Sequence, residues 1–234
     1  MTGKLTYFSS DNMEVKIKIE DEYRKFHYDG DLNITVITLL EELGNRVDYS
    51  CSCLQGLCGA CAMVINGEPK LACQTFLKDE QMTKEYGVIT IEPLSKFPLI
   101  KDLKVDRSIL YDSLKNSRLW LDSDADIKED DLQFEYEMSL CLMCGCCCEA
   151  CPNYDLGDFV GAHIPVSASK LINQEKDSAH VKEIKKSYKK GFYNHCVKSL
   201  ACEDTCPAAI PTQRAISRMN RKAVWRIRDL FNHD

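Results

Sequence analysis

Apolar and polar residues alternate over several short stretches in the first part of the chain. Residues 15–19 place apolar side chains between charged ones, which predicts a strand with one buried face. Further strands are predicted over residues 23–28 and residues 88–91. The Asn66-Gly67 pair predicts a tight hairpin, because a type I′ turn needs positive φ at both central positions. We therefore expect a small mixed sheet here.

Helical spacing occurs once within this region and dominates the remainder of the chain. Apolar residues at positions 36, 39, 40 and 43 predict a helix that ends at Gly44. A last helix is predicted after Pro211-Thr212, and it has one apolar face. That face comprises Ile216, Met219, Ala223, Ile227 and Leu230.

The change from alternating to helical periodicity indicates two domains. From about Lys101 onward, long charged stretches surround short cysteine-rich segments. We expect an α+β fold with a boundary near residues 100–106, which gives domains of residues 1–104 and 105–234. The acidic stretch of residues 122–131 is predicted to be a solvated linker.

The composition of the 234-residue chain is ordinary for a globular protein, except for its fourteen cysteines. A net charge of −6 gives no argument for nucleic acid as a partner. No apolar run is long enough to span a bilayer, and no signal-type stretch follows the first residues, so we expect the chain to stay in the cytosol. That compartment is reducing, so the cysteines are expected to bind metal rather than to form disulfides.

Basic residues concentrate in the predicted last helix of this otherwise acidic chain. Two interpretations are open: contact with anionic lipid headgroups or membrane subunits, or a solvated helical face. The residues are Arg214, Arg218, Arg221, Lys222, Arg226 and Arg228.

The first group of cysteines has the spacing of a plant-type [2Fe–2S] site. Gly56 and Gly59 lie inside its loop, where backbone N–H groups must turn inward to hydrogen-bond sulfur, and glycine permits such dihedral angles. A structural zinc site is the alternative, but zinc sites usually pair two short two-cysteine knuckles, which this segment lacks. Cys51 gives the wrong interval to Cys58 and is left out. The predicted ligands are Cys53, Cys58, Cys61 and Cys73.

Two further cysteine segments, each ending in Cys-Pro, form a diverged internal repeat. The first has the run typical of bacterial ferredoxins, in which the fourth cysteine ligates the other cluster. The second has the same run with Ser199 in place of its second cysteine. The runs comprise Cys141, Cys144, Cys147 and Cys151 before Pro152, and Cys196, Cys202 and Cys206 before Pro207.

Exchange of the fourth cysteines leaves the two clusters with unequal numbers of thiolates. A cubane that lacks one protein ligand loses that iron readily, so the second of these clusters is expected to be [3Fe–4S]. The alternative is a complete cubane with the Ser199 oxygen or water on the fourth iron, but oxygen is a harder and poorer partner than thiolate. Cys146 and Cys148 are interpreted as small buried apolar residues. The predicted ligands are Cys141, Cys144, Cys147 and Cys206 for [4Fe–4S], and Cys151, Cys196 and Cys202 for [3Fe–4S].

A two-iron domain followed by a double-cluster domain with one cysteine missing resembles the iron–sulfur subunit of succinate dehydrogenase and fumarate reductase. Residues 91–94 and 97–106 look like the family's interdomain stretch, so the resemblance covers nearly the whole chain. It implies an N-terminal plant-type ferredoxin domain with a β-grasp-like fold. A mostly α-helical domain similar to bacterial ferredoxins would follow.

The resemblance also implies a place within a larger complex. The family's subunit lies between a flavoprotein, which interconverts succinate and fumarate at covalent FAD, and membrane anchor subunits that bind quinone and, in some members, haem. Electrons would pass between FAD and quinone through the [2Fe–2S], [4Fe–4S] and [3Fe–4S] clusters, in either direction. The chain would then lie on the cytoplasmic side of the cell membrane, held there by the anchor subunits.

The family's quinone pocket maps onto Pro152, Leu156 and Ser199, near the predicted three-iron cluster. Ubiquinone-linked members usually carry Trp at the place of Leu156 and His at the place of Val197, so the resemblance favours menaquinone or a fumarate-reducing enzyme. His195 is either a hydrogen-bond donor or proton carrier near this cluster, or a packed histidine.

No nucleotide loop, Ser/His/Asp arrangement or framed carboxylate pair is visible, so no catalytic residue is predicted. The dicarboxylate chemistry is expected on the partner. Two alternatives are open: the iron–sulfur subunit of a soluble fumarate reductase with a non-quinone donor, and a free ferredoxin-like carrier or structural metal protein. The remaining histidines show no ligand spacing and are assigned no role: His27, His163, His180 and His233.

Overall fold

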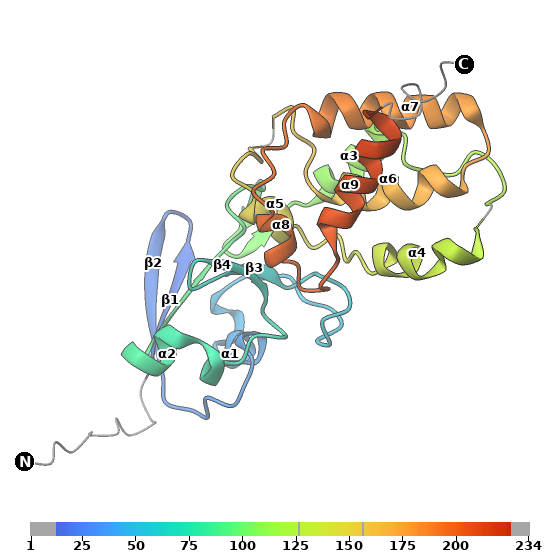
Figure 1. Cartoon of the computed structure of the whole chain (residues 1–234). Helices are drawn as coiled ribbons and strands as arrows, with labels where there is room; N and C mark the ends of the chain where they lie inside the picture. Colours follow the sequence, from blue (N-terminus) through green and yellow to red (C-terminus); the bar gives the residue numbers. More distant parts are fainter. Residues whose placement is uncertain (1–12, 126, 156, 226–234) are drawn as a thin grey trace, which may run out of the picture. The chain divides into compact units, whose positions relative to one another are not determined.

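A computed structural model describes residues 13–125, 127–155 and 157–225 of the chain. They form two compact units, which are described separately (Figure 1). One unit contains the chain up to Pro93 together with Leu99–Lys104, and the other contains Leu94–Pro98 and the residues from Val105 onward. The chain therefore passes between the units three times. The single sequence boundary between residues 104 and 105 remains our proposal.

The first unit contains a five-stranded mixed sheet with the order β2-β1-β5-β3-β4. The central β1 and β5 run parallel, with Val15 opposite Ile89 and Ile17 opposite Ile91, and all four side chains are fully buried. The other neighbours are antiparallel. The strands are β1 (Met13–Ile19), β2 (Glu22–Tyr28), β3 (Ala62–Ile65), β4 (Glu68–Leu71) and β5 (Val88–Glu92).

Three predictions for this region are confirmed. The alternating stretches are strands, and the predicted helix is α1 (Val36–Glu42), where the Thr35 hydroxyl accepts a hydrogen bond from the Thr38 amide as an N-cap. Asn66 and Gly67 have φ of 48° and 82°, as the hairpin turn requires. The other elements are η1 (Gly44–Arg46), η2 (Leu77–Asp79), α2 (Gln81–Tyr86), β6 (Leu99–Lys101) and β7 (Lys104–Val105).

The second unit is mostly helical, and with the sheet of the first unit it confirms the α+β class. Helix α6 is its centre, because it packs against α3, α4, α7 and α9. The helices are α3 (Ser108–Asn116), η3 (Glu129–Asp131), α4 (Leu132–Ser139), α5 (Cys146–Ala150), α6 (His163–Gln174), α7 (Ser178–Tyr188), η4 (Lys189–Tyr193), α8 (Ala201–Asp204) and α9 (Thr212–Ala223).

Helix α9 buries the apolar face that the sequence predicts, as far as the structure describes it. Ile216 and Met219 are buried and Ala223 is half-buried, whereas the predicted positions 227 and 230 lie outside the described residues. The basic side chains of α9 are partly engaged within the unit. Arg214 pairs with a carboxylate of α4, and Arg218 pairs with Asp131 and lies 4.2 Å above the ring of Phe134.

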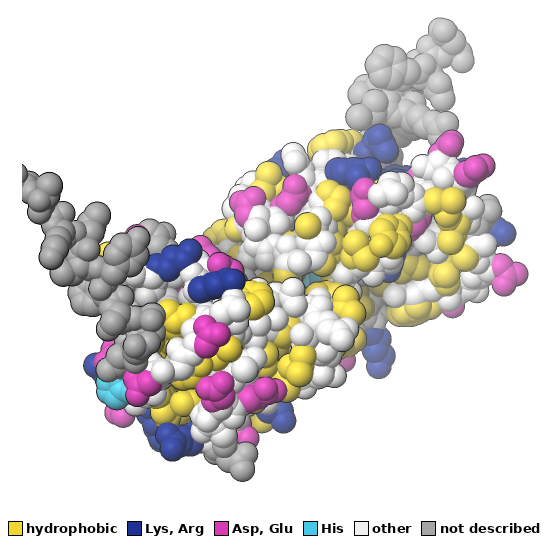
Figure 2. Space-filling model, turned by 90° about the horizontal axis from the view of Figure 1, so that it is seen from below, with side chains coloured by type: hydrophobic (Ala, Val, Ile, Leu, Met, Phe, Trp, Pro, Cys, Tyr) yellow, Lys and Arg dark blue, Asp and Glu magenta, His cyan; other side chains and the backbone are white. Residues whose placement is uncertain are grey.

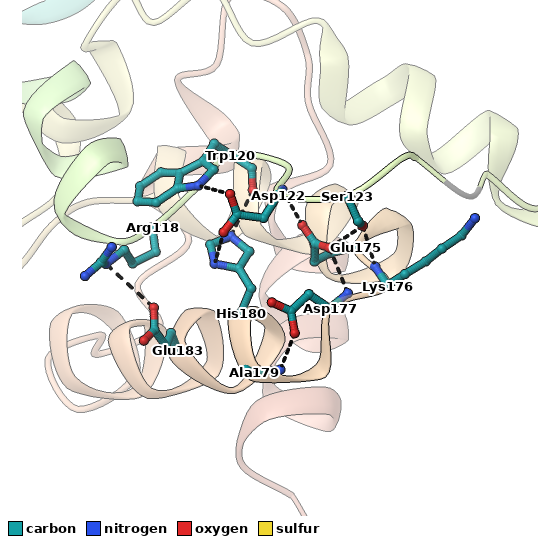
Figure 3. Close-up of polar contacts among 10 residues, drawn as sticks. All are labelled: Arg118, Trp120, Asp122, Ser123, Glu175, Lys176, Asp177, Ala179, His180 and Glu183. Carbon is teal, nitrogen blue, oxygen red and sulfur yellow. Dashed lines mark hydrogen bonds and ion pairs between the residues drawn. The ribbon is translucent and has the colours of Figure 1, made fainter.

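The described residues of the acidic stretch 122–131 are mostly exposed, as predicted for a solvated linker, but both ends of the stretch are held by hydrogen bonds or ion pairs. The Asp122 amide donates a 2.7 Å hydrogen bond to Glu175, and the Ser123 hydroxyl donates to the same carboxylate (Figure 3). At the other end, Asp131 pairs with Arg218. The two ends of the segment are therefore held by α9 and by the turn between α6 and α7. Both partners lie more than fifty residues away in sequence.

Surface charges show no single sign on the face drawn in Figure 2, where Lys and Arg side chains are interspersed with Asp and Glu. In the part of the chain that the structure describes, no helix is long and apolar enough to cross a bilayer.

Candidate metal centres

The first group of predicted ligands lies around the β3–β4 hairpin. Cys53 and Cys58 are half-buried in the loop before β3, whereas Cys61 and Cys73 are buried at the two ends of the hairpin. The Ala72 amide donates a 3.1 Å hydrogen bond to the Cys61 carbonyl, so the hairpin brings the chain next to Cys73 back beside Cys61. The hairpin thus joins the fourth cysteine to the loop.

Backbone N–H groups of this loop point at sulfur. The amides of Gln55 and Leu57 donate to Cys53 Sγ at 3.4 and 3.3 Å, and the Ala60 amide donates to Cys58 Sγ at 3.4 Å. The bond from Gln55 contributes most to lowering the pKa of Cys53 to about 7. A thiolate is the form that binds metal, so these hydrogen bonds favour the metal-binding form of Cys53.

Positive φ values allow these amides to turn inward. Gly56 and Gly59 have φ of 73° and 69°, and a Cβ on Gly56 would lie 2.9 Å from the side chain of Gln74. Leu54 also has a positive φ, of 56°, which is unusual for a side chain of this size. Leu54 and Leu57 are 47% and 68% exposed, so the loop presents apolar side chains to solvent.

The second unit contains a cavity lined by four thiols. Its empty space is about 380 Å³, part of it open to solvent, and its lining includes Cys141, Cys144, Cys147 and Cys206. The first three thiols flank the start of α5, where Gly145 has a φ of 91°. Burial raises the pKa of the Cys141 thiol to about 11. Cys206 belongs to the other Cys-Pro segment, so this cavity combines thiols from both segments.

A second cavity, of about 320 Å³, is lined by three thiols and a serine. The thiols are those of Cys151, Cys196 and Cys202, and the hydroxyl-bearing residue is Ser199. Burial raises the pKa of Cys202 to about 12. The rim is more exposed than the floor, because Ser199 is exposed and Val197 is 61% exposed.

The chemistry of these two linings suits iron–sulfur clusters. Thiols whose pKa burial has raised stay protonated near neutral pH unless a cation compensates the thiolate, and iron supplies that charge. Within residues 13–125, 127–155 and 157–225, no three His, Cys, Asp or Glu side chains converge closely enough for one metal ion. A cluster of several irons separates its ligands more widely than a single ion does. The assignment of individual ligands stays a prediction.

Other predicted residues lie nearby. Cys146 and Cys148 are fully buried, as expected. Pro152 is exposed beside Cys151, and Leu156 lies outside the described residues. His195 is half-buried, with its ring centroid 6.5 Å from that of Phe159, which agrees with a packed histidine. Its role as a donor or proton carrier toward the cluster stays a prediction.

Two residues that the sequence left without a role contact the four-thiol cavity. The guanidinium of Arg107 donates to the Cys144 carbonyl at 3.2 Å, and its charge adds to the hydrogen bond with Cys146 that chiefly lowers the pKa of the Cys144 thiol. His163 lines the cavity itself and is 2% exposed. Burial lowers the pKa of His163 to about 4, so its imidazole is neutral near pH 7. No spacing rule could find either residue, because their partners are distant in sequence.

Comparison with known proteins agrees with this geometry. Residues 11–112 match a family model described as a 2Fe-2S iron-sulfur cluster binding domain. The chain is 31% identical over 224 residues to the succinate dehydrogenase iron-sulfur subunit of Bacillus subtilis, covering 86% of this chain and 87% of the relative. It is 32% identical over 213 residues to the fumarate reductase iron-sulfur subunit of Wolinella succinogenes, covering 82% and 85%.

A solved structure supports the fold. A chain of the Mycobacterium smegmatis Sdh1 complex in the apo form superposes with a TM-score of 0.77 at 19% identity, covering 94% of this chain and all of that chain. The helical unit has thiol-lined cavities, and the sheet unit has a cysteine loop. The two relatives match over most of their length. These observations together assign the chain to a family. The chain belongs to the family of iron–sulfur subunits of succinate dehydrogenases and fumarate reductases.

Proposed function

We propose that the chain carries electrons one at a time between an FAD-containing dicarboxylate subunit and membrane quinone. A [2Fe–2S] cluster on Cys53, Cys58, Cys61 and Cys73 would exchange electrons with the flavin. A [4Fe–4S] and then a [3Fe–4S] cluster would connect it to the quinone. Succinate and fumarate would be handled by the flavoprotein, because no substrate-transforming site is proposed on this chain.

One observation carries the proposal: the two cavities have different linings, of four thiols and of three thiols with a serine. Iron–sulfur clusters supply reversible one-electron transfer when bound. Each lining combines side chains from both Cys-Pro segments, which is the exchange that the bacterial ferredoxin run predicts. The oxygen of Ser199 is a poorer iron ligand than a thiolate, so the second cavity suits a cluster that lacks one iron.

The exposed apolar loop of the sheet unit is the proposed contact for the flavoprotein. Leu54 and Leu57 lie between the predicted ligands Cys53 and Cys58, and both are largely exposed. Apolar side chains without partners on a surface are typical of protein contacts. Docking there would bring the flavoprotein next to the first cluster and exclude water from the loop.

The exposed rim of the three-thiol cavity is the proposed side for quinone. Val197 and Ser199 form part of this rim, and Pro152 follows the predicted ligand Cys151. We favour menaquinone, because the sequence has Leu156 and Val197 where ubiquinone-linked members usually have Trp and His. Anchor subunits would hold the chain on the cytoplasmic side of the membrane.

Anaerobic purification with spectroscopy tests the proposal. The protein should contain about nine irons per chain, give a three-iron EPR signal when oxidised and give a two-iron signal when reduced. The complex isolated with its flavoprotein and anchors should reduce or oxidise a menaquinone analogue faster than a ubiquinone analogue. A colourless protein without inorganic sulfide would refute the cluster assignment.

The same purification separates the alternatives. Recovery of a complete active enzyme without membrane subunits would identify a soluble fumarate reductase with another donor. Recovery of the chain alone, with clusters but no flavoprotein, would identify a free carrier.

A further inference from the structure

His163, which lines the four-thiol cavity, belongs to a row of buried polar groups. His163 Nε2 lies 2.6 Å from the Ser113 hydroxyl, and His163 Nδ1 lies 3.8 Å from Cys148 Sγ. Tyr154 lies close by, since a Cβ on Gly161 would meet both Cys148 Sγ and the ring of Tyr154. All four side chains are at least 90% buried, so each depends on the others for its hydrogen bonds.

The protons in this row can be assigned from the donors and acceptors. The Ser113 hydroxyl donates its single proton to the Leu110 carbonyl at 2.7 Å, so its oxygen accepts from His163 Nε2–H. The neutral imidazole then has an unprotonated Nδ1, which accepts the S–H of Cys148. In this arrangement Ser113 and His163 each donate one hydrogen bond and accept another.

The backbone is shaped to allow this arrangement. Gly161 has a φ of 86°, and a Cβ there would lie 2.7 Å from Cys148 Sγ and 3.2 Å from His163 Nδ1. A side chain at this position would therefore separate the thiol from the imidazole. The close approach of the two groups is built into the loop before α6.

The direction of the Cys148 proton matters because of its neighbour in sequence. Cys148 directly follows Cys147, a predicted ligand of the four-iron cluster, in α5. A donor to a cluster sulfur stabilises the reduced state, which has the extra negative charge, and so raises the reduction potential. While His163 Nδ1 accepts the S–H of Cys148, that donor is withheld from the cluster.

We infer that His163 is a positioning residue that keeps the reduction potential of the four-iron cluster low, by holding the Cys148 S–H away from the sulfur of Cys147. The inference rests on the proposed function, because it assumes the four-iron cluster in this cavity. It assigns a role to a histidine and a cysteine that are not themselves predicted ligands.

The test is an EPR-monitored redox titration of the full chain, purified anaerobically with its clusters. His163→Leu frees the Cys148 proton, so it should raise the potential. We expect a change of roughly tenfold in the one-electron reduction equilibrium of the four-iron cluster, about 59 mV. His163→Gln can accept from Cys148 and donate to Ser113, so it should give a smaller shift. Adding Cys148→Ala to His163→Leu should also reduce the shift.

A matched control is His180→Leu. His180 is also buried in the helical unit, where Nε2 lies 3.0 Å from the Trp120 carbonyl oxygen, but it does not line the four-thiol cavity (Figure 3). This variant should leave the four-iron potential unchanged, and the two-iron cluster serves as an internal reference in both variants. General loosening of the unit would move both histidine variants alike.

An unchanged or lowered four-iron potential in His163→Leu would overturn the inference, as would a shift of full size in the Cys148→Ala background. The proposed function fails differently. In that case the wild-type protein would show no four-iron cluster to titrate. A variant that retained less iron but kept the wild-type potential would show a purely structural role for His163 and so count against us.

Discussion

Replacement of Cys206 by alanine tests whether the two cysteine segments exchange ligands. Cys206 follows α8, yet it lines the cavity with Cys141, Cys144 and Cys147. Without it that cavity has three thiols, the same number as the cavity that is predicted to hold the three-iron cluster. The fourth iron should then be lost by the same physical cause, because no soft ligand retains it.

The magnitude follows from the number of thiols in each cavity. Wild-type protein should give about one oxidised three-iron EPR signal per chain, and Cys206→Ala about two, while iron falls by about one in nine. Ser199→Cys changes the other cavity in the opposite sense. A fourth thiolate there should retain the missing iron, so the oxidised signal should disappear and iron should rise to about ten.

Spin integration of the oxidised EPR spectrum, with iron and sulfide analysis on the same samples, measures these outcomes. Cys146→Ala is the matched control, because Cys146 is a fully buried cysteine that is not a predicted ligand, and its removal should leave the signal at one per chain. Loss of the original three-iron signal in Cys206→Ala would refute the reasoning, since it would mean that each segment binds its own cluster.

Three further variants test other parts of the structure. Leu57→Asp should weaken flavoprotein binding about tenfold in a titration, because it puts a charge in an apolar contact; Tyr86→Asp, equally exposed but on α2, should not. Tyr188→Phe should cost about 1–3 kcal/mol of unfolding free energy in thermal melts, because it leaves the buried Asn220 oxygen without its 2.7 Å partner, and an unchanged melting temperature would contradict this. Glu175→Gln should lower the melting temperature at pH 7, and the difference from wild type should shrink between about pH 4.5 and pH 2. The reason is that hydrogen bonds, chiefly from Ser123, hold the pKa of Glu175 at about 2 in the folded state, below its unfolded value, so the stabilisation is complete above the unfolded pKa and is lost as pH falls toward the folded one. A difference that stayed constant with pH would contradict this origin.

The sequence alone determined the elements whose signals are local. Alternation over residues 15–19 predicted a strand, because a side-chain period of two must match one buried face. Asn66-Gly67 fixed the hairpin, because few residues tolerate positive φ at two adjacent positions. The intervals between cysteines, and Ser199 in one of them, similarly supplied the ligand predictions, since ligand spacing is a property of one short loop.

Only the tertiary structure decided the contacts between residues distant in the chain. Ser113 and His163 are fifty residues apart, and Asp131 and Arg218 are eighty-seven residues apart. Neither pair leaves a periodic trace, because packing of α3 on α6 and of α4 with its neighbours brings them together. The lone histidine at position 163 therefore had no visible role in the sequence. Burial beside a thiol, a serine and a cavity gave it one, because a polar group without water must take its hydrogen bonds from whatever the fold places beside it.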